Sequence, residues 1–306
     1  LWASICGARR CTKSTAYSAP RSWLHISSIF TKLLSCMLTI AIFLGGLVLG
    51  SFLNVCISRL HTQEEIVLSR SHCVSCKKNL KVLELIPLVS FLFLRGRCSN
   101  CKERISWQYP LVELGTAILV TLLFLKYQDL ATALHFRKLF GLTQRTDQPL
   151  FLLPFRDLFF LAILMIIFVY DFLYYTILDK VTLPAIVIAF CLNLVLGFSV
   201  PRMLLTALLL VLFFTIQYVV SKGKWVGGGD IRLAFLLGVM LSWTSALDAL
   251  LSAYIFGSLV CIILVLARVK KLSSMVPFGS FLAATAAYNI LFGPVFVHWY
   301  LELLRV

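Results

Sequence analysis

The sequence has few charged residues, and acidic residues are the scarcest. Only 13% of the 306 residues are charged, with 28 Lys and Arg against 13 Asp and Glu, whereas 60% are hydrophobic. Soluble globular chains carry about 25% charged residues. The shortage of charge therefore excludes an ordinary soluble domain and indicates a polytopic membrane protein.

The excess of basic residues does not indicate a nucleic-acid partner. The formal net charge is +15, but the basic side chains are spread over short polar segments between apolar stretches and form no single patch. Cytoplasmic loops of membrane proteins are enriched in Lys and Arg in this way. We therefore expect the lipid bilayer, and no nucleic acid, as a partner.

The first 36 residues differ from the rest of the chain. They contain five Lys or Arg residues and no acidic residue, and the first methionine is Met37. No small-residue cleavage site follows the apolar run, which argues against a secretory signal peptide. We interpret residues 1–36 as a leader or as sequence upstream of the true start, and residues 37–57 as the first membrane span.

Further apolar stretches follow along the chain, and about 20 such residues cross a bilayer. The predicted fold class is an all-α polytopic membrane protein with about eight transmembrane helices. Within the first span, Gly46 and Gly50 are four residues apart, a spacing that favours close helix packing. The expected spans are residues 37–57, 109–125, 152–170, 181–200, 203–220, 231–243, 247–267 and 278–304.

A polar, basic segment, residues 58–108, separates the first two spans and contains Cys73-Val-Ser-Cys76 and Cys98-Ser-Asn-Cys101. Two such pairs at this separation are typical of a four-thiolate zinc ribbon. The basic residues place the segment in the cytoplasm, where disulfides are uncommon. We predict a structural zinc site with four cysteine ligands in a small cytoplasmic insertion.

Two other features of this region have structural interpretations. The apolar piece 83–94 is too short to span a membrane, so we expect it to lie against the membrane or to pack on the spans. Glu113 lies in the first turn of the second span, where it could neutralise a cation of the cysteine segment or favour the helix N-terminus. A catalytic role for Glu113 is possible, but the structural one is preferred.

Two aspartates are candidate catalytic residues. Asp171 follows the apolar run 158–170, and Asp230 follows three consecutive glycines, Gly227, Gly228 and Gly229. A carboxylate at the edge of a span is costly and is a functional candidate by default. The glycines allow positive φ and close approach of another backbone, such as an extended peptide substrate.

Counting the spans places both aspartates on the same membrane face as the cysteines. Two carboxyl groups there could share a proton, one activating a water molecule and the other donating to a scissile carbonyl. The simpler interpretation is that each is an interfacial charge. For Asp171 alone that interpretation is preferred, and for Asp230 the functional one is.

From Met37 onward, the order and spacing of these features resemble the type IV prepilin peptidase family, also called leader peptidase and N-methyltransferase. No single motif decides the matter. The matching segments are Gly50-Ser-Phe-Leu-Asn-Val, both cysteine pairs, Leu94-Arg-Gly-Arg-Cys98, Arg104-Ile-Ser-Trp-Gln-Tyr-Pro-Leu-Val-Glu-Leu114, Asp171 with Leu183-Pro184, Gly227-Gly-Gly-Asp-Ile-Arg-Leu233 and Pro277-Phe-Gly-Ser-Phe281.

The resemblance implies a membrane aspartic endopeptidase of the Gly-x-Gly-Asp class. Such enzymes remove the basic leader from prepilin or pseudopilin precursors at the cytoplasmic face of the bacterial inner membrane. Asp171 and Asp230 match the catalytic pair, and Asp179 matches an aspartate not expected to be catalytic. Many members also methylate the new N-terminus with S-adenosylmethionine, an activity associated with the cysteine segment, residues 58–108. Residues 109–306 would form the peptidase domain.

The chain departs from the family pattern at Leu178, Arg232 and Ser280, which affects the expected substrate preference more than the chemistry. The alternative function is a transporter or channel with a zinc-stabilised cytoplasmic domain, because intramembrane carboxylates also mark ion pathways. Against it, both aspartates lie at the ends of spans, whereas transporters place their sites near the midplane.

Overall fold

A computed structural model describes residues 21–64, 71–73, 75–139, 150–268 and 276–304. The chain divides into two units, residues 1–41 and 42–306, and the packing described below is that of the second unit. The expected division at residue 36 falls inside a continuous helix, which begins at Arg21. Residues 1–20 lie outside the described part.

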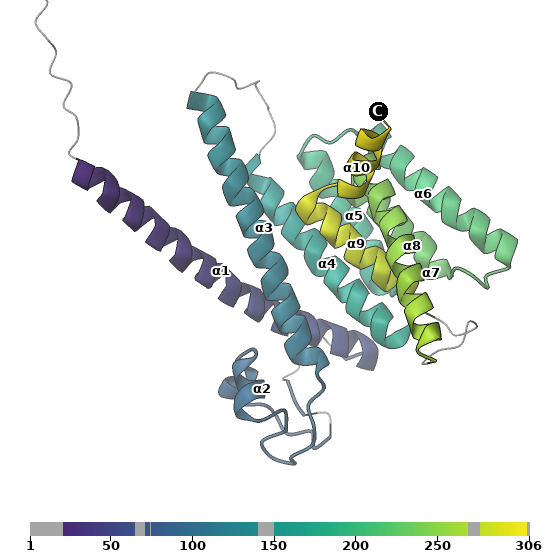
Figure 1. Ribbon diagram of the computed structural model, residues 1–306. Helices are drawn as coiled ribbons and strands as arrows, with labels where there is room; N and C mark the ends of the chain where they lie inside the picture. Colours follow the sequence, from purple (N-terminus) through teal and green to yellow (C-terminus); the bar gives the residue numbers. More distant parts are fainter. Residues whose placement is uncertain (1–20, 65–70, 74, 140–149, 269–275, 305–306) are drawn as a thin grey trace, which may run out of the picture. The chain divides into compact units, whose positions relative to one another are not determined.

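The described residues are helical, and pairing between extended segments is limited to isolated bridges in the insertion. The α-helices are α1 (Arg21–Thr62), α2 (Val89–Phe93), α3 (Gln108–Leu139), α4 (Leu153–Tyr174), α5 (Asp179–Val195), α6 (Val200–Ser221), α7 (Gly228–Met240), α8 (Trp243–Leu266), α9 (Phe278–Phe292) and α10 (Val295–Leu303), with short 3₁₀ turns at Val82–Leu85 and Leu150–Leu152 (Figure 1).

All eight expected spans are helical, so the fold class is confirmed, but fewer helices than expected are long enough to cross a membrane. Five described helices satisfy the length and hydropathy of a span, or six if the bent pair α9 and α10 is one span. At 1.5 Å per residue, α7 is only about 20 Å long, short of the roughly 30 Å hydrocarbon core. Helix α5 has 17 residues and is also slightly short.

The last expected span, residues 278–304, is not one straight helix. It bends by 75° between α9 and α10, at Gly293, whose φ is +79°. The buried carboxylate of Asp248 fixes this bend, because it accepts hydrogen bonds from the Val297 N–H at 2.7 Å and the Asn289 Nδ2 at 3.1 Å.

Small residues bring α1 against α3, as the spacing predicted. A Cβ atom on Gly46 would lie 2.6 Å from the Ala117 Cα, and one on Gly50 would lie 2.7 Å from the Glu113 Cα. Neither glycine could carry a side chain without moving a backbone. This contact fixes the α1 segment within residues 42–62 beside the start of α3, where the insertion leaves the bundle.

The main core lies among α4 to α9, and its largest fully buried side chains include Phe160 and Phe214. Helix α9 packs against both α4 and α8, and α7 packs against both α5 and α6. Helices α4 and α9 therefore lie side by side, with the end of α4 next to the start of α9 (Figure 1). This arrangement joins residues more than 100 positions apart.

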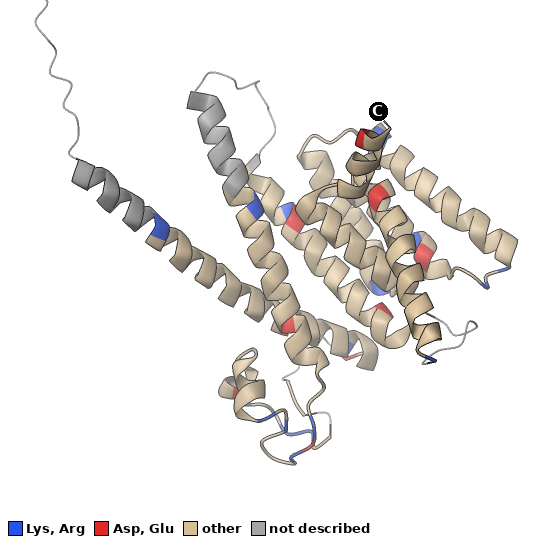
Figure 2. Cartoon of the chain, in the orientation of Figure 1, with Lys and Arg blue, Asp and Glu red and all other residues tan. Residues whose placement is uncertain are grey.

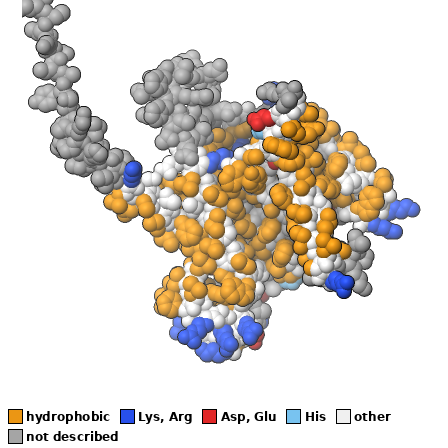
Figure 3. Space-filling model, in the orientation of Figure 1, with side chains coloured by type: hydrophobic (Ala, Val, Ile, Leu, Met, Phe, Trp, Pro, Cys, Tyr) orange, Lys and Arg blue, Asp and Glu red, His pale blue; other side chains and the backbone are white. Residues whose placement is uncertain are grey.

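The insertion, residues 63–107, presents basic and apolar side chains separately. Lys and Arg line its loops (Figure 2) and gather at the lower end of the molecule (Figure 3). The apolar piece 83–94, expected to face the membrane or the spans, forms a 3₁₀ turn and the short α2, and its side chains Leu83, Leu92 and Phe93 are largely exposed. An exposed apolar surface beside a membrane domain suits contact with lipid.

Candidate active site

Asp171 occupies the last turn of α4 and is almost completely buried, with 5% of its surface exposed. Its Oδ2 atom accepts hydrogen bonds from the Ser280 backbone N–H at 2.6 Å and from the Ser280 hydroxyl at 2.9 Å. Ser280 lies in the first turn of α9, where free N–H groups carry partial positive charge. A carboxylate is therefore held at the start of a helix.

Gly279 makes this contact possible. A Cβ atom at this position would lie 3.0 Å from the Asp171 Oδ2 and 2.9 Å from the Ile177 Cδ1. Any larger residue would push α9 away from the carboxylate. The segment Pro277-Phe-Gly-Ser280 thus supplies both the space for Asp171 and its two hydrogen-bond donors.

Asp230 is the third residue of α7 and is partly buried. Its Oδ2 atom accepts a hydrogen bond from the Gly227 N–H at 3.0 Å, which closes the first turn of the helix. Of the two properties that glycine allows, positive φ is not used here, because none of the three residues is among those with positive φ. Space is required at Gly229 alone, where a Cβ atom would lie 3.0 Å from the Ile177 Cβ, whereas Gly228 has no atom within 4 Å of such a Cβ.

The structure brings the two candidate aspartates to one place. The Ile177 side chain contacts both Gly229, next to Asp230, and Gly279, next to Asp171. The charge of Asp171 also acts on the carboxyl group of Asp230. Within the described residues, neither carboxylate forms an ion pair with Lys or Arg. The site therefore contains two neighbouring carboxyl groups without a compensating cation.

Asp179 has a different environment. It begins α5, is about half exposed, and forms an ion pair with Arg232 one turn into α7. A solvent-exposed pair of this kind joins two helices and contributes little free energy. This contact fits the expectation that Asp179 is not catalytic.

The four predicted cysteines form one cluster. Their sulfur atoms all lie within 4.8 Å of one another, and no other cluster of three or more potential metal ligands occurs among the described residues. The Sγ atoms of Cys73 and Cys101 are 3.8 Å apart. A tetrahedral site with Zn–S bonds of about 2.3 Å has sulfur–sulfur distances of about 3.8 Å, so the cluster fits a four-thiolate metal ion.

The two cysteine pairs have the same local backbone. The Cys73 N–H donates to the Lys78 carbonyl at 3.0 Å, and the equivalent Cys98 N–H donates to the Glu103 carbonyl at 2.8 Å. The residue after each pair, Lys77 or Lys102, has positive φ. Each pair is thus a tight turn that directs two sulfurs to one side.

Backbone donors favour thiolates in this cluster. The Lys78 N–H lowers the pKa of Cys76 to about 6. The N–H groups of Cys101 and Asn100 lower the pKa of Cys98. The thiolate is the form that binds metal, so these donors prepare Cys76 and Cys98 for a cation. At Cys101 the Glu103 N–H has the same lowering effect, but burial and the neighbouring cysteine side chains outweigh it and raise the pKa to about 11.

Glu113 makes a structural contact that the sequence did not predict. It is buried, and its Oε2 atom accepts a hydrogen bond from the Leu88 N–H at 2.8 Å, which ties the insertion to α3. Leu88 has a φ of +58°, so this contact holds the backbone in an uncommon conformation. Nearby, Asn54 of α1 donates to the Tyr109 carbonyl at 3.0 Å.

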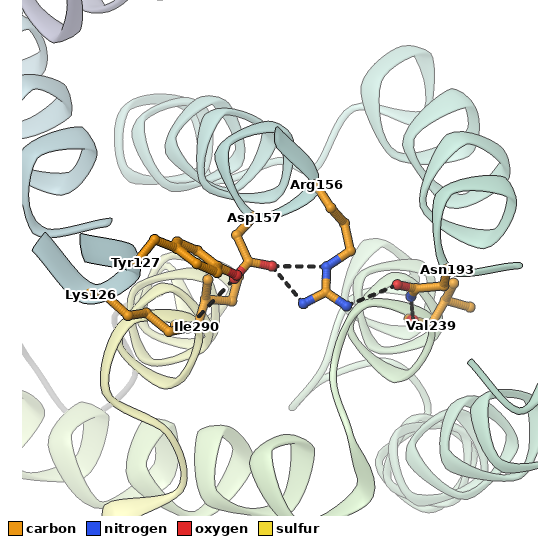
Figure 4. A network of polar contacts seen from close by, with 7 residues as sticks. All are labelled: Lys126, Tyr127, Arg156, Asp157, Asn193, Val239 and Ile290. Atoms are coloured by element: carbon orange, nitrogen blue, oxygen red, sulfur yellow. Dashed lines mark hydrogen bonds and ion pairs between the residues drawn. The ribbon is translucent and has the colours of Figure 1, made fainter. Parts of the chain in front are cut away.

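The sequence did not reveal the role of Ser280, although it lies in a recognised segment. The available signal was a hydroxyl at the start of an apolar stretch. The sequence also did not reveal the polar network at the opposite end of the bundle, which Figure 4 shows around the buried Asp157. Its signal was the adjacent pair Arg156 and Asp157 inside an expected span.

Comparison with known proteins confirms the resemblance. The bacterial peptidase A24 N-terminal domain matches residues 44–127, and the type IV leader peptidase family matches residues 158–266. No solved structure matches the chain significantly.

Curated relatives match most of the chain. A prepilin leader peptidase/N-methyltransferase from Aeromonas hydrophila is 31% identical over 85% of this chain and 92% of its own length. The protein of the same name from Bacillus subtilis is 30% identical over 86% of this chain and 97% of its own length. A third relative of the same name, from Pseudomonas putida, is 29% identical over 81% of this chain and 88% of its own length. These relatives are peptidases, so the transporter alternative receives no support.

Proposed function

The chain belongs to the type IV leader peptidase family, and we propose that it removes the basic leader peptide from type IV prepilin-like or pseudopilin precursors. The observation that carries the proposal is the meeting of Asp171 and Asp230 around Ile177, without a basic partner among the described residues. Two adjacent carboxyl groups are the catalytic unit of aspartic peptidases.

In the proposed reaction, one carboxylate acts as general base and takes a proton from a water molecule that attacks the scissile carbonyl carbon. The other carboxyl group, kept protonated by its neighbour's charge, donates to the carbonyl oxygen. The tetrahedral intermediate then breaks its C–N bond, and the leaving amine takes up a proton. The pair titrates as a unit, so the roles are not divided between Asp171 and Asp230.

Ser280 would position the pair. Its N–H and hydroxyl both bind the same oxygen of Asp171, which leaves the other oxygen for water or substrate. Fixed donors of this kind hold a carboxylate in one orientation through a catalytic cycle.

The glycine run would receive the substrate backbone. Gly227 and Gly228 are exposed, and no atom lies within 4 Å of a Cβ placed on Gly228. The leader peptide could therefore lie in an extended conformation against Gly228, beside Asp230. Gly229 faces Ile177 and would not be available.

We place the site at the cytoplasmic face of the inner membrane. Asp230 lies at the start of α7, directly after the end of α6 and the loop with Lys222 and Lys224, and Lys and Arg also line the loops of the insertion (Figure 2). Positive residues flanking spans mark the cytoplasmic side. A multi-pass protein in this orientation would meet precursors whose leaders are still in the cytoplasm.

We assign residues 58–108 to N-methylation of the new N-terminus with S-adenosylmethionine, and residues 109–306 to the peptidase domain. The relatives' names couple the two activities. In the insertion, Cys73, Cys76, Cys98 and Cys101 would hold a zinc ion that supplies folding energy to a segment with little apolar core. Four protein ligands leave no open coordination position, which suits a structural ion.

The test is cleavage of a pilin-like precursor in detergent at equal amounts of folded protein. Asp171→Asn and Asp230→Asn should each lower the rate by roughly a thousandfold or more, in the range of lost general acid–base catalysis. Asp179→Asn is the matched control, because this carboxylate lies at the same end of the bundle but pairs with Arg232. It should keep nearly full activity.

Retention of cleavage by both dyad variants would show that the carboxylates are not the catalytic groups. Equal loss in Asp179→Asn would show that removing any carboxylate at this end disturbs the site, and the dyad assignment would have no support from the experiment.

A further inference from the structure

The short helix α2 of the insertion exposes its apolar side chains. Leu92 is 72% exposed and Phe93 is 84% exposed, and Val89, one turn earlier, is 43% exposed. Side chains three and four residues apart share one face of a helix, so these three form an apolar face. No described residue covers this face, and the proposed peptidase reaction does not use it. An uncovered apolar surface of this kind marks an interaction site.

A buried contact fixes α2 beside the beginning of a membrane span. Leu88, the residue before α2, donates its N–H to the Glu113 Oε2 atom at 2.8 Å, and Glu113 lies near the start of α3. Helix α3 is one of the candidate spans. Helix α2 therefore lies at the depth where the hydrocarbon core gives way to the lipid headgroups.

The lipid-facing side of α3 continues onto the insertion. Leu111, Leu114 and Ile118 are exposed, and their spacing of three and four residues places them on one side of α3. Trp107 lies one turn before Leu111 and is 69% exposed, and its ring centre is 5.1 Å from that of Phe91 in α2. Trp is enriched at membrane interfaces. The surface that meets lipid on α3 thus extends to α2 through this aromatic pair.

Basic side chains lie next to the apolar face. Residues 71–107 contain seven Lys or Arg and only two acidic residues, Glu84 and Glu103. Arg95 and Arg97 follow α2 directly. Figure 3 shows the basic side chains of the insertion beyond its apolar ones, on the side away from the bundle. All seven are exposed and form no ion pair with a described residue, namely Lys77, Lys78, Lys81, Arg95, Arg97, Lys102 and Arg104.

An anionic lipid surface matches both features. Apolar side chains enter the acyl boundary, and each Lys or Arg near an anionic membrane strengthens binding roughly fivefold. The basic leader of a precursor has the same sign of charge as the insertion and would be repelled. A nucleic acid would pair with the cations but would leave Leu92 and Phe93 uncovered.

We propose that the insertion binds the anionic surface of the cytoplasmic leaflet. Leu92 and Phe93 would lie among the outer parts of the acyl chains, and Arg95 and Arg97 would contact lipid phosphates. The lipid would stabilise α2, which is too short to be stable by itself. The proposed orientation names the leaflet, but the binding and its test depend neither on that orientation nor on the peptidase reaction.

The test measures amide hydrogen exchange of the full chain in two kinds of nanodisc, one of phosphatidylcholine alone and one that also contains phosphatidylglycerol. The Leu92 and Leu94 amides, which donate to the Leu88 and Ser90 carbonyls, should exchange about tenfold more slowly with the anionic lipid, because binding opposes local unfolding. High salt should remove the difference by screening. The amides of α9 are the internal reference and should not respond.

Two paired substitutions test the cations. Arg95→Gln together with Arg97→Gln should lose most of the tenfold difference between the two kinds of nanodisc. Arg95→Lys together with Arg97→Lys keeps both charges and should keep the difference. Lys222→Gln together with Lys224→Gln removes two exposed cations from the loop after α6, outside the insertion. This pair is the matched control and should behave as the wild type does.

Substitution of Phe93 tests the apolar face. Phe93→Ser should speed the exchange of the Leu92 and Leu94 amides in both kinds of nanodisc, because it removes the side chain that enters the acyl region. Phe93→Leu keeps an apolar side chain and should retain the slow exchange.

Four results would overturn the proposal. The first is equal exchange of the α2 amides in the two kinds of nanodisc, and the second is a difference that persists at high salt. The third is an equal loss in the two Gln pairs, which would indicate an effect of net charge without a binding surface. The fourth is wild-type exchange in Phe93→Ser, which would place the apolar face outside the membrane.

Discussion

Helix α4 carries a buried aspartate near each end, and the two have opposite surroundings. Asp157, 2% exposed, accepts hydrogen bonds from Arg156 and Tyr127 and lies 3.5 Å from the Lys126 ammonium. Asp171, 5% exposed, accepts hydrogen bonds from Ser280, forms no ion pair with any described residue, and shares its site with the carboxyl group of Asp230. The charge of the aspartate is balanced by neighbouring cations at one end of α4 and is not balanced at the other.

The comparison separates structural from functional burial. A buried carboxylate paired with cations adds little net stability, but removing one partner is expensive because it leaves the other charge buried and unpaired. A buried carboxyl group beside a second one costs stability and is retained where it is needed for chemistry. Partners, and not burial, therefore distinguish the catalytic candidate from the structural aspartate.

The largest change should come from the insertion beside the Asp171 end. Replacing Cys73, Cys76, Cys98 and Cys101 by Ser should remove one zinc per chain and unfold the insertion. The unfolding is expected because structural zinc sites contribute on the order of 10 kcal/mol to folding. Metal analysis and limited proteolysis would measure the loss and the unfolding of residues 63–107. The single change Cys191→Ser, in α5, is the control. Full zinc retention in the quadruple variant would disprove the cluster as the metal site.

The sharpest test of the comparison is substitution of each aspartate of α4 by Asn. Asp157→Asn should lower the free energy of unfolding by about 3 kcal/mol, because it leaves Arg156 and Lys126 without their buried partner. Asp171→Asn should leave it unchanged or raise it, because it removes a repulsion with Asp230. Thermal unfolding would measure both. Equal destabilisation by the two variants would contradict the distinction.

A smaller effect is expected at the hydroxyl that holds Asp171. Ser280→Ala removes one of its two donors and should slow precursor cleavage about tenfold, roughly the cost of one hydrogen bond to a charged group. The change should appear in kcat more than in KM. Ser252→Ala, which removes a long 3.5 Å contact to the buried Asp248, is the matched control and should leave cleavage intact. An unaltered cleavage rate in Ser280→Ala would contradict the proposal that Ser280 positions Asp171.

The smallest expected effect concerns the substrate path. Gly228→Ala adds a methyl group where no protein atom lies within 4 Å, so folding should be unaffected while KM for the precursor rises severalfold. Gly238→Ala is the contrasting change, because its Cβ would lie 2.3 Å from the Ala207 Cα and should reduce stability. Steady-state kinetics measures the change in KM expected of Gly228→Ala, and unfolding curves measure the loss of stability expected of Gly238→Ala. A normal KM in Gly228→Ala would place the substrate elsewhere.

Hydropathy and motif spacing were enough to predict the class of the protein and most of its parts. Length and hydropathy predicted an all-helical membrane protein, because a span needs only a sufficient run of apolar residues. The spacing of Cys73, Cys76, Cys98 and Cys101 predicted their cluster, since each pair is a local turn. The resemblance to the type IV prepilin peptidase family rested on ordered motifs, and the curated relatives confirmed it.

The surroundings of each buried charge depend on how distant helices pack, and the sequence did not predict them. Asp171 and Ser280 are 109 residues apart, and Lys126 meets Ile290 across 164 residues, so no local pattern reveals these partners. The glycines before Asp230 allowed positive φ or close approach, and only the structure shows that positive φ is not used and that Gly229 packs against the Ile177 side chain. The electrostatic environment of a carboxylate depends on which helices pack around it, and long-range packing is not encoded in any short stretch of the chain.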